Sequence, residues 1–111
     1  MHDKYRTCIE ACDRCEAECE HCAMMCAEEP DAQARGKCMQ ALRDCADLCA
    51  LASRLMARGS ALAARVCDLC AQACDACAQE CARFKDQHCQ KCADECRKCA
   101  QECRNMAMAT V

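Results

Sequence analysis

The chain has 111 residues and a net charge of -3, with 19 Cys but no Trp, one Tyr and one Phe. This length predicts a single domain that spans residues 1–111. The weak negative charge provides no basic field for nucleic acid or an anionic membrane surface, and no run of about 18 apolar residues is available to span a bilayer. Because large apolar side chains are scarce, small Cys and Ala side chains must fill the interior.

The first half of the chain predicts two helices. The first is expected over about residues 3–27, because Pro30 forbids helix continuation in its neighbourhood. The second is expected from the mid-thirties to about residue 57, with Asp31 or a nearby residue as its cap. Gly59 follows it and is typical of a helix stop.

The second half predicts two more helices. Ser60 is an N-cap candidate that opens a third helix ending near Arg83. The step from Cys81 to the next cysteine is eight residues rather than seven, which predicts a break at residues 84–87. A fourth helix then runs to about Met108, and one long helix across the break is the alternative.

Cysteines recur at steps of three and four residues, and this spacing returns side chains to one face of an α-helix. The mean spacing of about 3.5 residues is the heptad period of bundle helices, and short connections force neighbouring helices to be antiparallel. The expected fold is therefore all-α, an antiparallel up-down-up-down four-helix bundle with a Cys-lined core. The candidate metal ligands are Cys8, Cys12, Cys15, Cys19, Cys22, Cys26, Cys38, Cys45, Cys49, Cys67, Cys70, Cys74, Cys77, Cys81, Cys89, Cys92, Cys96, Cys99 and Cys103.

High cysteine content is also typical of secreted disulfide scaffolds. Here the number of cysteines is odd and no secretory signal opens the sequence. Residues three or four apart on a helix have Cβ atoms about 5–6 Å apart, whereas a relaxed disulfide needs about 3.5–4.5 Å. We therefore expect a reduced, cytoplasmic protein, and a disulfide-stapled structural bundle is the alternative.

Thiolates select Cu(I), Zn(II) and iron–sulfur clusters among biological metals. Cu(I) fits best, because a monovalent ion shared between bridging thiolates leaves a buried core nearly neutral, whereas uncompensated buried thiolates are very costly. Four sulfurs also suit tetrahedral zinc, so a zinc or cadmium thiol sponge for detoxification is the alternative. No nucleophile, base and orienting group occur as a set, so we do not expect an enzyme.

The repeated CxxxC pairs on four helical segments, from Cys8 to Cys103, resemble the bacterial copper storage proteins. The cytosolic branch is the closer match, because no export signal is present. The resemblance implies storage of multiple Cu(I) ions per chain in the cytoplasm, thiolate-bridged copper along the bundle axis with the nineteen cysteines as ligands, and a homotetramer. No residue identifies a copper-exchange partner.

One end of the predicted bundle gathers the first and third connections with soft ligands nearby. Thioether and imidazole groups are suitable weak ligands for Cu(I), so we expect an entrance relay of His88, Met24 or Met25, and Met39. The alternative for each Met is an adaptable filler of core or surface. The opposite end is expected to form an apolar plug of Tyr5, Ile9, Leu51, Leu55, Met56, Leu62, Val66 and Met106.

Overall fold

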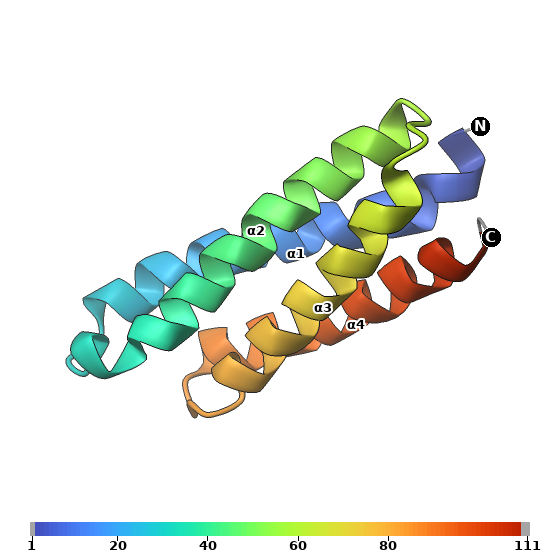
Figure 1. Ribbon diagram of the computed structural model, residues 1–111. Coiled ribbons are helices and arrows are strands. Elements are labelled where there is room, and N and C mark those ends of the chain that lie inside the picture. The colour runs from blue at the N-terminus through green and yellow to red at the C-terminus, as the bar shows by residue number, and fades with distance from the viewer. Residues whose placement is uncertain (1, 110–111) are drawn as a thin grey trace.

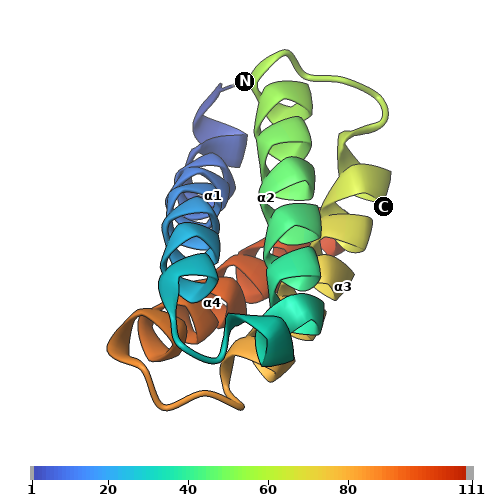
Figure 2. The same ribbon diagram turned by 90° about the vertical axis from the view of Figure 1, so that its left-hand side faces the viewer.

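The computed structural model describes the backbone of residues 2–109 and the side chains of residues 4–108. Its helices are α1 (His2–Glu28), the short 3-10 helix η1 (Ala32–Arg35), α2 (Gly36–Ala57), α3 (Ala63–Cys81) and α4 (Gln87–Ala109). Figures 1 and 2 show the four α-helices as an elongated antiparallel bundle, with extents of 46 × 18 × 18 Å. The predicted up-down-up-down four-helix bundle is confirmed.

The two ends of the bundle differ in what they carry (Figure 1). The α1–α2 and α3–α4 connections lie together at one end, which we call the mouth end. The α2–α3 connection lies at the other end with the first turn of α1 and the last turn of α4, and we call this the plug end. Each helix packs against two neighbours, so that α1 contacts α2 and α4, and α3 contacts the same two helices.

The α2–α3 connection is a Schellman turn. Gly59 has a φ of 64°, and its amide donates to the carbonyl of Met56 at 3.1 Å while the Ser60 amide donates to Leu55 at 2.9 Å. The Ser60 hydroxyl accepts a hydrogen bond from the Leu62 amide at 3.1 Å. The predicted helix stop is confirmed, and α3 begins at residue 63 rather than 61.

The break between α3 and α4 is also confirmed, because residues 82–86 are not helical. The carbonyl of Asp86 accepts hydrogen bonds from the amides of Cys89 at 3.1 Å and Gln90 at 3.0 Å, which begins α4. One long helix across this segment is therefore excluded. The one-residue slip in cysteine spacing marks the point where the chain reverses.

The α1–α2 connection differs from the prediction. It contains η1, which the sequence pattern did not indicate, and Asp31 makes no side-chain capping hydrogen bond. The Asp31 carboxylate instead accepts a hydrogen bond from Nε of Arg35 at 2.7 Å. Ion pairing across one helical turn replaces the expected cap.

The core between the helices consists of small side chains. All nineteen cysteines are at most 1% exposed, and Leu42 and Met56 are the largest side chains that are fully buried. Alanines such as Ala52 and Ala93 fill positions beside the cysteines and are fully buried as well. Within residues 2–109, no helix combines the length and the apolar character needed to cross a bilayer.

Candidate metal centre

The cysteine side chains of all four helices meet along the bundle axis as free thiols. Sulfur atoms from different helices approach one another closely. Examples are Sγ of Cys45 and Cys74 at 3.5 Å and Sγ of Cys15 and Cys96 at 3.7 Å. The helical spacing of three and four therefore produces one continuous sulfur core.

Several groups of four thiols have all their sulfurs within 4.8 Å of one another. Neighbouring groups share members: Cys49 and Cys99 both belong to two groups, and Cys19 and Cys96 both belong to two others. A shared sulfur is placed to bridge two metal ions. Four all-cysteine groups of this kind are Cys12/Cys49/Cys70/Cys99, Cys15/Cys49/Cys74/Cys99, Cys15/Cys19/Cys45/Cys96 and Cys19/Cys77/Cys92/Cys96.

Burial makes thiols at both ends of the core weak acids. Burial and, second to it, the neighbouring Cys26 together raise the pKa of the Cys89 thiol to about 12. At the plug end, the contact of Cys67 with Cys103 lowers its pKa, but the contact with Cys8 and burial outweigh this and raise the pKa to about 12. These thiols are protonated at neutral pH, so each of them loses one proton when it binds metal, and metal charge replaces the charge of that proton.

One group at the mouth end contains an imidazole. Cys22, Cys26, His88 and Cys89 have their ligand atoms within 4.8 Å of one another, and we call them the mouth cluster. Nδ1 of His88 lies 3.3 Å from Sγ of Cys22 and 3.5 Å from Sγ of Cys89. Nε2 of the same ring is buried without a hydrogen-bond partner and lies 3.9 Å from a carboxylate oxygen of Asp86.

Arg35 lies directly against the mouth cluster. It is 5% exposed, and its Nη1 lies 3.6 Å from Sγ of Cys26 and 3.6 Å from Sγ of Cys89. Its guanidinium also stacks over the Phe84 ring, 4.4 Å from the centroid. A positive charge thus lies next to the outermost sulfurs of the core.

Two carboxylates hold Arg35 in place from the solvent side. Nε lies 2.7 Å from Asp31 and Nη1 lies 2.5 Å from Asp86, so the side chain ties the α1–α2 and α3–α4 connections together. Burial alone would lower the pKa of Arg35, but its hydrogen bonds to Asp31, Cys26 and Asp86 raise it above its ordinary value. Sequence analysis missed this residue, and the four-residue spacing from Asp31 was the only signal for it.

The methionines of the predicted entrance relay lie in two separate grooves. Met24 and Met39 line a groove between α1 and α2, and Met24 is 52% exposed. Met25 lines a groove between α1 and α4 together with His88 and His21. The structure therefore brings Met25 to His88 and separates Met24 and Met39 from them.

The predicted apolar plug is partly correct. Tyr5, Leu55, Met56 and Met106 are at most 9% exposed, and Ile9 and Val66 pack against the core from its edge. Leu51 and Leu62, however, are 39% and 53% exposed. These two residues lie on the outer surface of the bundle rather than in the plug.

Comparison with known proteins identifies the family of this sulfur-lined bundle. A sequence model of the copper storage protein family matches residues 1–108. The chain belongs to the copper storage protein family. The resemblance stated from the CxxxC pattern is thereby confirmed, and a comparison with curated proteins gives no match.

Solved structures of copper storage proteins have the same fold. Apo-Csp3 from Bacillus subtilis is 43% identical with a TM-score of 0.88, over 93% of this chain and 98% of that chain. The Cu(I)-bound protein BsCsp3 is 43% identical with a TM-score of 0.89, over 94% and 98% of the two chains. A cytosolic copper storage protein from Streptomyces lividans with five coppers is 34% identical with a TM-score of 0.92, over 96% and 94%.

Proposed function

We propose that the chain is one metal-binding domain that stores many Cu(I) ions in the cytoplasm through the thiolates of its core, without catalysing a reaction. The observation that carries this function is the sharing of sulfurs between neighbouring four-thiol groups. A similar copper storage protein from Streptomyces lividans is cytosolic, and Ccsp from the same organism was loaded with 10 copper equivalents; these support the compartment and the capacity.

Charge balance favours Cu(I) over zinc or cadmium in the shared groups. A divalent ion with four thiolates carries two negative charges, and overlapping groups would bring such charges together in a dry core, which is very costly. A Cu(I) ion shared between bridging thiolates balances one thiolate charge. The ratio of metal to sulfur can then approach one without charge accumulation.

Titration of the reduced protein tests this function. Anaerobically isolated apoprotein should show 19 free thiols in denaturant. Competition against a strong cuprous chelator should then show more than about ten Cu(I) ions per chain, because bridging thiolates bind several metals each. Oxidised cysteines would favour the disulfide-stapled bundle, and saturation near one metal per four sulfurs would favour the zinc or cadmium sponge.

The entrance for copper is at the mouth end, through His88 and the soft ligands near it. Met25 and His88 line one groove and lead to the mouth cluster, since Nδ1 of His88 contacts Cys22 and Cys89. Met24 and Met39 form a second set of thioethers in the other groove. Of the proposed relay, Met25 with His88 has the stronger structural support.

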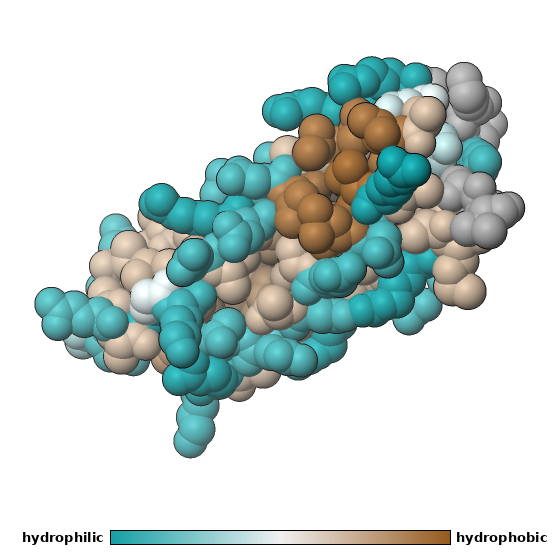
Figure 3. All heavy atoms as spheres, viewed as in Figure 1, coloured by the Kyte–Doolittle hydropathy of each residue, from teal (hydrophilic) through white to brown (hydrophobic). Residues whose placement is uncertain are grey.

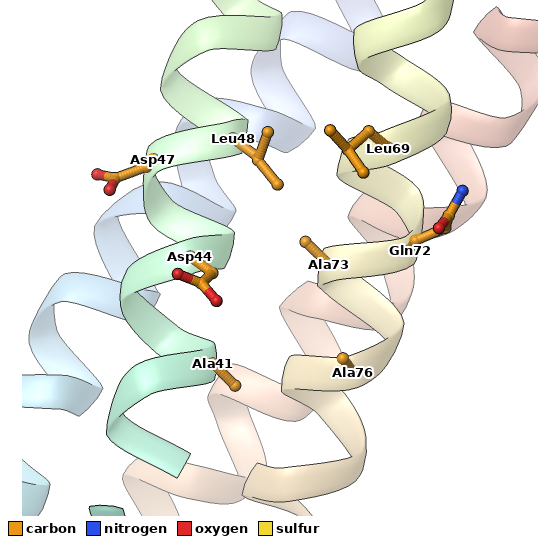
Figure 4. Close-up of a pocket in the computed structure, with 8 residues that line it drawn as sticks. All are labelled: Ala41, Asp44, Asp47, Leu48, Leu69, Gln72, Ala73 and Ala76. Carbon is orange, nitrogen blue, oxygen red and sulfur yellow. The ribbon is translucent and has the colours of Figure 1, made fainter. Parts of the chain in front are cut away.

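The chain assembles into a tetramer, as the resemblance implies, and an apolar surface supports self-association. Figure 3 shows hydrophobic residues gathered over α2 and α3. Leu51 of α2 and Leu69 of α3 are large apolar residues that are 39% and 49% exposed. A groove of about 400 Å³ lies between these helices (Figure 4).

Sedimentation tests the assembly. The wild type should have four times the 12.2 kDa chain mass, and the double variant Leu51→Glu/Leu69→Glu should have a lower mass. A monomeric wild type would contradict the assembly and leave copper storage intact.

A further inference from the structure

Five of the six distances between ligand atoms of the mouth cluster are close to those of a tetrahedral metal site. The sulfur–sulfur distances are 4.0 Å for Cys22–Cys26, 3.8 Å for Cys22–Cys89 and 3.8 Å for Cys26–Cys89. Nδ1 of His88 lies 3.3 Å and 3.5 Å from two of these sulfurs. Tetrahedral zinc, with bonds of about 2.3 Å to sulfur and 2.0–2.1 Å to nitrogen, needs edges of roughly 3.8 Å and 3.6 Å.

The charge around this cluster differs from that of the all-cysteine groups. A divalent ion with three thiolates and a neutral imidazole carries one negative charge, and the Arg35 guanidinium lies 3.6 Å from two of the sulfurs. Among the described side chains, Arg35 is the one buried charged residue. Its carboxylate partners Asp31 and Asp86 are 51% and 32% exposed, so water screens them, whereas the sulfurs are fully buried.

The surroundings of His88 also fit a metal-bound imidazole. Nδ1 faces the sulfurs, while the buried Nε2 has no hydrogen-bond partner. Metal-bound histidines donate their other ring N–H to a carboxylate or carbonyl that fixes the ring. Asp86, 3.9 Å away, is the carboxylate that a small ring rotation would bring within reach.

We propose that, in the copper-free protein, the mouth cluster binds one divalent ion of the zinc class through Cys22, Cys26, Cys89 and His88, with Arg35 as its counter-charge. The ion links α1 to α4 and closes the mouth of the sulfur core. Two Cu(I) ions carry the charge of one Zn(II), so copper displaces the zinc as a hydrated ion without changing the charge of the cluster. The site uses cysteines at the mouth end of the core that also bind copper, so zinc occupies it only while copper is absent. Zinc binding there does not depend on the storage function.

Titration of the apoprotein with Zn(II) tests the site, with Co(II) as a spectroscopic probe of the same ligands. In competition with a chromogenic zinc chelator, the wild type should bind one tight Zn(II) per chain. Its Co(II) form should show the visible bands of tetrahedral coordination and sulfur-to-cobalt charge transfer. Cys89→Ser and His88→Ala should lose tight binding or shift these bands, whereas Cys70→Ser, in an all-cysteine group, should leave both unchanged.

A matched pair of arginine variants tests the counter-charge. Arg35→Gln should weaken Zn(II) binding at least tenfold, whereas Arg83→Gln should not, although Arg83 also stacks on Phe84, 5.6 Å from the ring centroid. Arg35→Lys should restore part of the affinity, because it keeps the charge but loses the two-pronged hydrogen bonding.

Three results would overturn the zinc site. These are the absence of tight binding, several tight ions per chain that Cys70→Ser also removes, and equal affinities for the two arginine-to-glutamine variants. The Cu(I) capacity of the same samples is measured in parallel. High copper capacity without tight zinc rejects the zinc site alone, and low copper capacity rejects the storage function alone.

Discussion

At the plug end, the sulfur core is closed by Tyr5, Leu55, Met56 and Met106, all at most 9% exposed. At the mouth end, it is closed by Arg35 and the carboxylates and imidazole around it. Apolar closure is non-directional and stabilises the fold in proportion to the area it buries. Closure by partly exposed ion pairs contributes little to stability.

The difference suggests that the two ends of the bundle have different roles. The apolar plug is expected to hold the helices together whether or not metal is present. The mouth offers ligands and charged groups that form specific contacts with an ion and can exchange them for water. Substitutions at the two ends should therefore affect different measurements, with stability changed at the plug and metal exchange changed at the mouth.

The largest effect on stability should come from the plug. Met56 is 1% exposed, and Met56→Ala should lower the free energy of unfolding by about 2–5 kcal/mol because it leaves a cavity. Met24 at the mouth end is 52% exposed. Met24→Ala should therefore change the free energy of unfolding by no more than about 0.5 kcal/mol. Urea unfolding of the reduced apoproteins measures both. Equal losses would contradict the assignment of stability to the plug.

The next largest effect is the pH dependence of Cu(I) binding, which should be the same for thiols at both ends of the core. The pKa values of Cys89 and Cys67 are raised to about 12, so below that pH each thiol loses a proton when copper binds. Apparent Cu(I) affinity should fall about tenfold per displaced proton for each unit by which the pH is lowered. Chelator competition between pH 6 and 8, corrected for the chelator, measures this slope.

Single substitutions compare the two ends in the same titration. Cys89→Ser and Cys67→Ser should each lower the number of protons released on copper loading by the same amount. If the guanidinium of Arg35 already kept Cys89 ionised in the apoprotein, only Cys67→Ser would lower the number of released protons. That outcome would show that the mouth and plug thiols differ in protonation before copper arrives.

Substitutions at the mouth end should slow copper loading, whereas substitutions in the plug should not. His88→Phe removes the imidazole that contacts Cys22 and Cys89, and stopped-flow loading with a cuprous donor should become clearly slower. Met106→Leu, a change of similar size in the plug, should leave the rate unchanged. Met25→Leu should slow loading more than Met24→Leu if the α1–α4 groove is the route. Unchanged rates for His88→Phe would reject the entrance at the mouth.

Local spacing predicted the bundle and its sulfur core because steps of three and four fix the face of a helix without any tertiary information. The break after Cys81 could be predicted for the same reason, since one extra residue rotates the stripe by about 100°. Both features depend only on neighbours in the sequence.

The arrangement of the mouth could not be predicted in this way. Arg35 is buried because Asp86, about fifty residues further along the chain, meets it across the bundle end. Met24 and Met25 must face different directions on a helix, but the groove that holds His88 depends on how α4 packs beside α1. Contacts between distant segments decide both, and no local spacing encodes them.

The smallest predicted effects come from the two glycines, one at each end of the bundle. Gly59 has a φ of 64°, so Gly59→Ala should destabilise the apoprotein by about 1 kcal/mol, and Gly59→Asn should cost less because Asn tolerates this conformation. Gly36 has helical angles of -56° and -45°, and a Cβ there would meet no atom within 4 Å. Gly36→Ala should therefore stabilise by about 0.4–1 kcal/mol. Thermal unfolding measures both changes in stability. If both alanine variants changed the stability in the same direction, the two connections would not differ in backbone constraint.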